Sequence, residues 1–108
     1  MAITTNDFDR YVVYHISGAP SGGNPFAAEI DCFSKAKRAG AIYFADSGAL
    51  PAPALTINGI YLYMPTSRFN EVIATLRYEK PLYLGLNTTS SVGWLGTSEE
   101  PVGEQEGV

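Results

Sequence analysis

The 108-residue sequence is poor in the residues that most often perform catalysis or bind metals. Its only cysteine is Cys32 and its only histidine is His15. A single cysteine excludes a disulfide within the chain and any metal site built from several of its own thiolates. No apolar run approaches the roughly 20 residues that a membrane-spanning helix needs. These absences disfavour a disulfide-stabilised scaffold, a metal–thiolate protein and a membrane-spanning protein.

The beginning of the chain also lacks the character of a secretory signal. Residues 1–10 are acidic and polar, whereas a signal begins with a basic segment followed by an apolar one. With the lone cysteine, this favours a cytoplasmic location. The length fits one domain, and a hydrophobic content of 45% is enough for one core.

The net charge of −4 arises entirely at the C-terminus. Four glutamates lie in residues 99–108, which leaves seven acidic residues of eleven in residues 1–98, against all seven Lys and Arg. The body is therefore neutral. We predict a single α+β domain over residues 1–97 and an acidic flexible tail over residues 98–108, where Glu, Pro, Gly and Gln dominate.

Several segments have the composition of β-strands. β-branched and aromatic residues or apolar alternation predict strands at 11–17, 26–32, 39–45, 55–57, 60–63, 82–86 and 92–96. In the second of these segments, Phe26, Ala28, Ile30 and Cys32 are expected on one face and Glu29 and Asp31 on the other. Asn58-Gly59 predicts a hairpin with a type I′ turn, which needs positive φ at both central residues.

One amphipathic helix is predicted between these strands. Phe69, Val72, Ile73 and Leu76 follow the i, i+3, i+4, i+7 spacing of one apolar stripe. Thr66 or Ser67 is expected to cap the helix, Glu71 to lie in its first turns, and Pro81 to end it. Strands, one helix and two more strands predict an α+β fold with an antiparallel sheet or partly closed barrel and the helix packed on it.

Catalysis has little support in the residue inventory, and neither an enzyme nor a cofactor is predicted. His15 and Cys32 could form a pair on neighbouring strands, but a core cysteine and a half-buried histidine are the favoured interpretation. Glu29 and Asp31 could hold a hard cation, yet they suit the solvated side of an alternating strand equally well. No catalytic or metal site is therefore predicted.

Two groups of residues are candidates for binding. Tyr61 and Tyr63 point opposite to the apolar residues of their strand, and Tyr14, Tyr43 and Tyr83 could extend their surface. Such a surface can stack bases or sugars, form a subunit interface, or serve as a second core layer. The second group is the basic cluster of Lys35, Lys37 and Arg38, which could contact phosphates or simply form a soluble turn.

Two resemblances accompany these patterns. Residues 76–83 (LRYEKPLY) and 96–104 (GTSEEPVGE) resemble the C-terminal part of small uncharacterised bacterial single-domain proteins, which implies one domain and no particular activity. The order of elements is similar to that of Whirly-type and transcriptional-coactivator single-stranded-DNA binders. That likeness implies nucleic-acid binding on a sheet face.

We therefore predict a non-enzymatic interaction domain that self-associates through its sheet, as a homodimer. The chain has a surplus of tyrosine and strands with two apolar faces. Such strands leave apolar surface or open edges that a second subunit would cover. The alternative is single-stranded nucleic-acid binding by Tyr61 and Tyr63 together with the Lys35, Lys37 and Arg38 tip, with the acidic tail competing for the same groove.

Overall fold

The computed structural model describes residues 2–18, 26–35, 37–46 and 50–98. In chain order its elements are β1 (Ile3–Phe8), β2 (Arg10–His15), β3 (Phe26–Ser34), β4 (Lys37–Ala45), β5 (Ala54–Thr56), β6 (Gly59–Pro65), the 3₁₀ turn η1 (Thr66–Arg68), α1 (Phe69–Tyr78), β7 (Leu82–Asn87) and β8 (Val92–Thr97). The predicted α+β class and the order of strands, helix and strands are confirmed. The tail predicted for residues 98–108 lies outside the described residues, except for Ser98.

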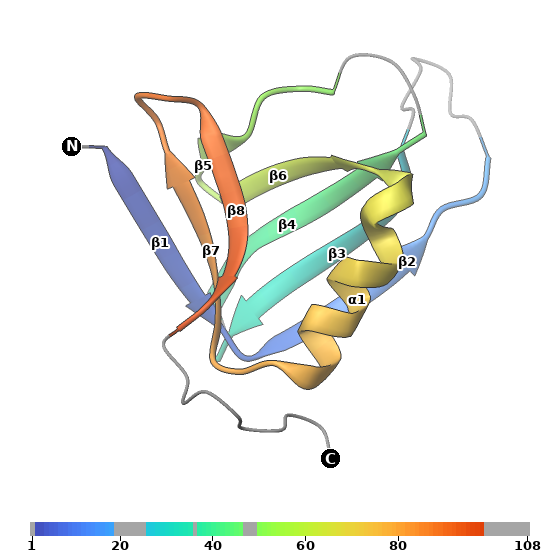
Figure 1. Cartoon of the computed structure of the whole chain (residues 1–108), viewed down its shortest axis with the longest axis horizontal. Coiled ribbons are helices and arrows are strands. Elements are labelled where there is room, and N and C mark those ends of the chain that lie inside the picture. The colour runs from blue at the N-terminus through green and yellow to red at the C-terminus, as the bar shows by residue number, and fades with distance from the viewer. Residues whose placement is uncertain (1, 19–25, 36, 47–49, 99–108) are drawn as a thin grey trace.

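The strands form two sheets and not the single sheet or partly closed barrel of the prediction. One sheet has the order β2-β3-β4-β6-β5 and the other the order β1-β7-β8. Figure 1 shows α1 and the three-stranded sheet on the same side of the five-stranded sheet. The division arises at Asp9, the one residue between β1 and β2, where the chain leaves one sheet and enters the other.

The pairing is antiparallel throughout except between β4 and β6, which are parallel. The chain leaves β4 through residues 46–53, forms β5, and then returns as β6 between β4 and β5. Because of this connection, the five-stranded sheet is mixed and not wholly antiparallel as predicted. The parallel pair matters because it aligns Tyr43 with Tyr63 in register.

Strand β1 was not predicted, because its sequence ITTNDF is largely polar. It pairs along its whole length with β7, from Ile3 beside Asn87 to Phe8 beside Leu82. Phe8 is buried, and the Asn6 side-chain amide donates a hydrogen bond of 3.0 Å to the carbonyl oxygen of Ala39. Backbone pairing and one amide contact therefore hold a strand that has almost no hydrophobic pattern.

The alternation predicted for residues 26–32 is confirmed for β3 except at its first residue. Ala28, Ile30 and Cys32 are buried, whereas Glu29 and Asp31 face the other way. A register shift between Phe26 and Ala28 reverses Phe26, whose ring lies tilted against the Tyr43 ring instead of entering the core. A β-bulge adds one residue and so changes which face the preceding side chain occupies.

The predicted hairpin is formed by β5 and β6, but its turn is not type I′. Thr56 pairs with Gly59, and of the turn residues only Gly59 has positive φ, at 105°. Thr56 Oγ1 accepts a hydrogen bond from the Asn58 N–H (3.0 Å) and donates to the Gly59 carbonyl oxygen (2.9 Å). This threonine stabilises an alternative turn in which Asn58 does not need the left-handed conformation.

The helix has the predicted position but a different beginning. Neither Thr66 nor Ser67 caps it; η1 precedes α1, whose N-cap position is Arg68, with no side-chain cap bond. Glu71 lies in the first turn as predicted and pairs with Arg68 at 2.6 Å. The helix ends at Tyr78, before Pro81, as predicted.

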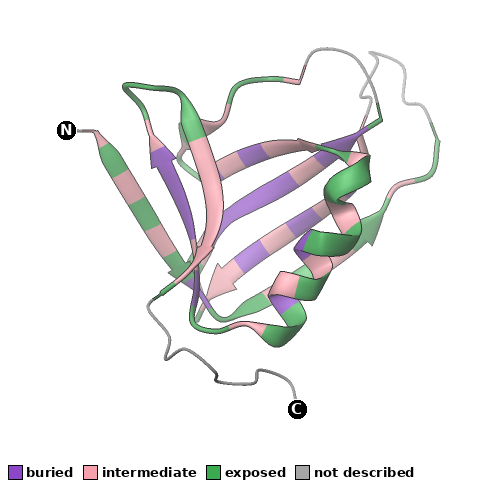
Figure 2. Cartoon of the chain, in the orientation of Figure 1, coloured by how far each residue is buried: buried purple, intermediate pink, exposed green. Residues whose placement is uncertain are grey.

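One core joins both sheets and the helix, and Figure 2 shows buried residues in strands of both sheets and in α1. Val72 and Leu76 of the predicted stripe are buried, while Phe69 and Ile73 are half-buried against the core. Phe69 packs edge-on against Phe44 of β4, with ring centroids 5.1 Å apart. Within the described part of the chain, no helix is both long and apolar enough to span a membrane.

Candidate functional site

Four aromatic rings gather on the outer face of the five-stranded sheet, the face opposite the core. Tyr43 is the centre of this group, with ring centroids 5.0 Å from Phe26, 5.3 Å from Tyr61 and 5.4 Å from Tyr63. Phe26 also stacks on Tyr63 at 5.7 Å. We call Phe26, Tyr43, Tyr61 and Tyr63 the aromatic cluster. Neither α1 nor the three-stranded sheet lies on this side of the molecule (Figure 1).

The strand registers explain why these rings meet. Tyr43 lies beside Tyr63 in the parallel β4–β6 pair, and Tyr61 lies beside Ala41. Ala41 has no exposed surface although it belongs to the outer face. The cluster is therefore a packed layer whose outer side remains partly exposed.

A charged group borders the aromatic cluster. Arg38 of β4 donates to Asp31 at 2.8 Å and to Glu29 at 3.4 Å, both on β3. Its second terminal nitrogen donates to the Tyr61 hydroxyl at 3.3 Å, and its guanidinium lies 5.4 Å from the Tyr61 ring centre. We call Glu29, Asp31 and Arg38 the charged triad. It fixes the Tyr61 ring by a hydrogen bond and a cation–π contact.

Partial burial changes the acid–base behaviour of this surface. Burial, together with a hydrogen bond and repulsion from Asp31, raises the pKa of Glu29 from 4.5 to about 7, although Arg38 acts in the opposite direction. Burial and the nearby Glu29 charge raise the pKa of Tyr43 to about 12. Near neutral pH the triad therefore carries less than its formal charge of −1, and the tyrosine stays neutral.

The raised pKa of Glu29 predicts that stability falls as pH rises toward 7. The folded protein retains this proton between about pH 4.5 and 7, while the unfolded chain has already lost it, so deprotonation favours unfolding in that range. In urea melts from pH 4.5 to 8, the Glu29→Gln variant should therefore gain stability relative to wild type as pH rises, with no further gain above about pH 7. A difference that stays constant over the whole range would contradict this assignment.

The structure brings three of the five predicted binding residues together. Tyr61 and Tyr63 belong to the aromatic cluster, and Arg38 bridges it to the triad. Lys35 and Lys37 are exposed where β3 connects to β4 and do not join the triad. Of the predicted basic tip, Arg38 is neutralised by carboxylates, whereas Lys35 and Lys37 form no ion pair with any residue that the structure describes.

The tyrosines expected to extend the surface divide between the two sheets. Tyr14 lies on the outer face beside Glu29, in the same row as Tyr43, and is 50% exposed. Tyr83 belongs to β7 in the other sheet, where its hydroxyl accepts a hydrogen bond of 3.1 Å from the Trp94 indole. Tyr83 therefore does not extend this surface, and that prediction was wrong because it placed all the strands in one sheet.

Sequence reasoning missed two features of the surface. Phe26 was assigned to the core, and only the bulge beside it reveals its place in the aromatic cluster. The pairing of Arg38 with Glu29 and Asp31 depends on the β3–β4 register, which places Arg38 beside Phe33. The sequence offered two signals for this pairing. One was a basic residue just after the turn, and the other was the carboxylates on the outer face of the preceding strand.

The Cys32–His15 pair considered from the sequence does not form. Cys32 lies beside Tyr11, and His15 lies beside Ala28, so four residues of β3, about 13 Å, separate the two positions. Burial raises the pKa of the Cys32 thiol to about 12, which removes the thiolate that a nucleophile needs. The His15 ring instead lies 5.3 Å from the ring of Phe69 on the helix.

The two carboxylates considered for a metal are occupied by protein contacts. Arg38 holds both Glu29 and Asp31, so its guanidinium stands where a cation would be expected. Over residues 2–18, 26–35, 37–46 and 50–98, no group of three or more His, Cys, Asp or Glu side chains is placed to hold a metal ion. Comparisons of the chain with protein-family models, with curated proteins and with solved structures found no match.

Proposed function

We propose that this chain is a non-enzymatic binding domain that self-associates as a homodimer through the outer face of its five-stranded sheet. The observation that carries the proposal is the aromatic cluster, which lies on a face that neither the helix nor the second sheet covers. Tyrosine, phenylalanine and arginine are enriched at the centres of protein interfaces. Rings already packed on one another also lose little entropy when a partner covers them.

The neighbouring edge strand extends this surface. Val12 and Tyr14 of β2 are 42% and 50% exposed, and β2 is the end strand of the five-stranded sheet. An unpaired edge beside exposed apolar side chains favours association with another chain. The face and the edge together support a larger contact than the aromatic cluster alone.

Charge favours a second copy over a nucleic acid as the partner. Residues 1–98 hold seven basic and seven acidic side chains, so these parts of two copies do not repel each other strongly. A phosphate backbone on this face would meet two carboxylates for one guanidinium, since Arg38 is already paired with Glu29 and Asp31. Lys35 and Lys37 alone offer weak support for the nucleic-acid alternative.

Sedimentation equilibrium of the full chain tests the proposal. At micromolar concentration we expect a mass near twice the 11.6 kDa of the chain, falling toward the single-chain mass on dilution. A single-chain mass at every concentration would overturn the homodimer. If that monomer also bound a labelled single-stranded oligonucleotide with steep salt dependence, the nucleic-acid alternative would replace it.

A further inference from the structure

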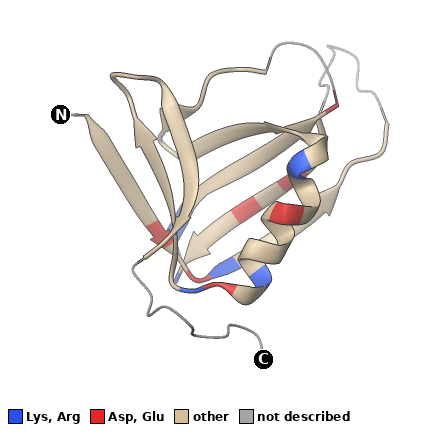
Figure 3. Ribbon diagram, viewed as in Figure 1, with Lys and Arg blue, Asp and Glu red and all other residues tan. Residues whose placement is uncertain are grey.

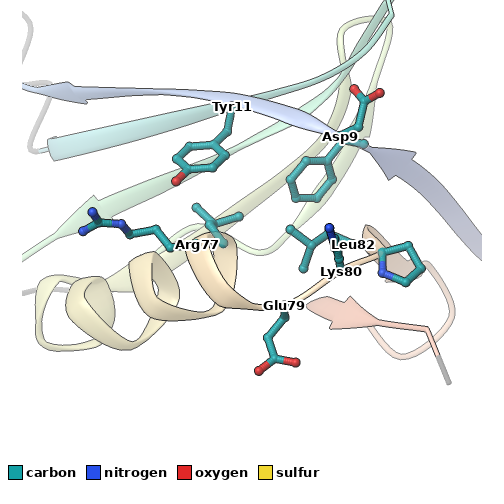
Figure 4. A pocket seen from close by; sticks show the side chains of 9 residues that line it. Asp9, Tyr11, Arg77, Glu79, Lys80 and Leu82 are labelled. Atoms are coloured by element: carbon teal, nitrogen blue, oxygen red, sulfur yellow. The ribbon is translucent and has the colours of Figure 1, made fainter. Parts of the chain in front are cut away.

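A separate pocket opens on the other side of the molecule from the aromatic cluster. It lies between the last turn of α1 and the corner where β1 passes into β2, and its volume is ≈ 460 Å³ (Figure 4). Its apolar wall is formed by Phe8, Tyr11, Leu76, Pro81 and Leu82. The volume and this wall are typical of sites that bind small molecules.

Its mouth carries two cationic side chains. Arg77 and Lys80 line the pocket and are exposed, and within the described part of the chain neither forms an ion pair. In Figure 4 the Arg77 side chain runs along the helix below the Tyr11 ring, whose hydroxyl is directed toward the helix. An anionic group at this mouth would therefore meet charge of the opposite sign.

Two carboxylates also line the pocket, but they are directed elsewhere. Asp9 pairs with Arg10 at 3.6 Å, and Figure 4 shows its carboxylate pointing away from the apolar centre. The Glu79 carboxylate likewise extends outward, below the chain segment that leaves the helix. Figure 3 shows this gathering of both charge signs where α1 ends and β1 meets β2. Arg77 and Lys80 therefore supply the positive charge at the rim of the pocket, and the formal charges of the four charged lining residues balance.

We propose that this pocket binds a small amphipathic molecule that carries a single anionic group. Its apolar part packs against Phe8, Leu76 and Leu82, and its anion lies at the mouth beside Arg77 and Lys80. A purely polar anion would leave the apolar wall exposed to water, and a neutral apolar molecule would gain no electrostatic attraction from the cations. This inference stands on the pocket alone and does not depend on the homodimer.

Titration of the ¹⁵N-labelled full chain with octanoate, followed by NMR, tests the proposal. Octanoate should shift the amides of residues 8–11 and 76–82 in a saturable way, and octylammonium, of equal length and opposite charge, should bind at least about fivefold more weakly. The variant Arg77→Glu/Lys80→Glu should lose about tenfold in octanoate affinity and reverse that preference. Both substitutions are at exposed positions, and the dispersion of the same spectra reports that the fold is retained.

Lys37→Glu is the matched control, because Lys37 is an exposed lysine that does not line this pocket. It should leave octanoate binding unchanged. Equal binding of octanoate and octylammonium would overturn the proposed anion site. So would a loss of octanoate affinity with Lys37→Glu as large as that with Arg77→Glu/Lys80→Glu. Absence of any saturable shift at residues 8–11 and 76–82 would overturn the pocket as a ligand site.

Discussion

Replacing Gly40 by Ala is expected to lower the free energy of unfolding by about 3 kcal/mol or more, because β4 leaves no room for a side chain there. A Cβ at this position would overlap the Ile60 carbonyl oxygen and lie 2.8 Å from the Ile60 nitrogen. These atoms belong to the backbone of the parallel partner β6, so they cannot move without disturbing that pairing. The Leu84 methyl, also 2.8 Å away, belongs to a side chain that can adjust.

Gly18→Ala is the matched control for this prediction. Gly18 also has positive φ, at 99°, but among the described residues no atom beyond its chain neighbours lies within 4 Å of the position of its Cβ. It should therefore cost only about 1 kcal/mol, from backbone strain alone. Urea melts of the two variants separate steric exclusion from strain. Equal losses for both would mean that β4 and β6 do not approach each other as described.

Replacing Phe44 by Ala is expected to cost about 3–5 kcal/mol, a large part of the stability of a small domain. Phe44 is fully buried in β4 and is in edge-on contact with Phe69 of the helix, at 5.1 Å between ring centroids. Truncation removes buried carbon and leaves a cavity between the sheet and α1 that neither rigid element can close.

Tyr78→Ala is the control for Phe44→Ala. Tyr78 belongs to α1, the helix on which Phe44 packs, but it is 48% exposed. It should change stability by no more than about 0.5 kcal/mol. Chemical denaturation of both variants, with the slope checked for two-state behaviour, gives the difference. If Tyr78→Ala were as costly as Phe44→Ala, the outer side of the helix would also be packed, and the assigned core would be wrong.

Local patterns predicted most of the elements and much of their orientation. The alternation in β3 and β6 correctly placed Ile30, Ile60 and Leu62 inside, with Asp31 and the tyrosines outside. The apolar period of α1 placed Val72 and Leu76 correctly as well. These patterns are readable because a half-buried element shows its environment in its own sequence.

The arrangement of these elements depended on contacts between distant segments. The polar strand β1 is recruited by pairing with β7, about 80 residues away, so its own residues gave no signal. The bulge that turns Phe26 outward is likewise a property of the β3–β4 register. The division into two sheets and the parallel β4–β6 pair depend on the path that the chain takes between strands. The residue pattern within a strand carries no information about that path.

The candidate site shows the same limit. Tyr61 and Tyr63 could be placed side by side from alternation alone, but their packing with Tyr43 required the parallel register. The neutralisation of Arg38 depended on which carboxylates lay opposite it. The pocket between residues 8–11 and 76–82 combines segments that no local pattern connects.

Sedimentation equilibrium of Tyr14→Glu beside Ile3→Glu tests most directly the claim that the outer face of the five-stranded sheet mediates self-association. The two positions are matched, because Tyr14 is 50% and Ile3 48% exposed, and they lie on different sheets. A glutamate at position 14 places a charge on the proposed interface, beside Glu29. We expect Tyr14→Glu to sediment as a single chain at a concentration where wild type and Ile3→Glu are dimers. Dimers of Tyr14→Glu with monomers of Ile3→Glu, or one mass for all three proteins, would contradict the account.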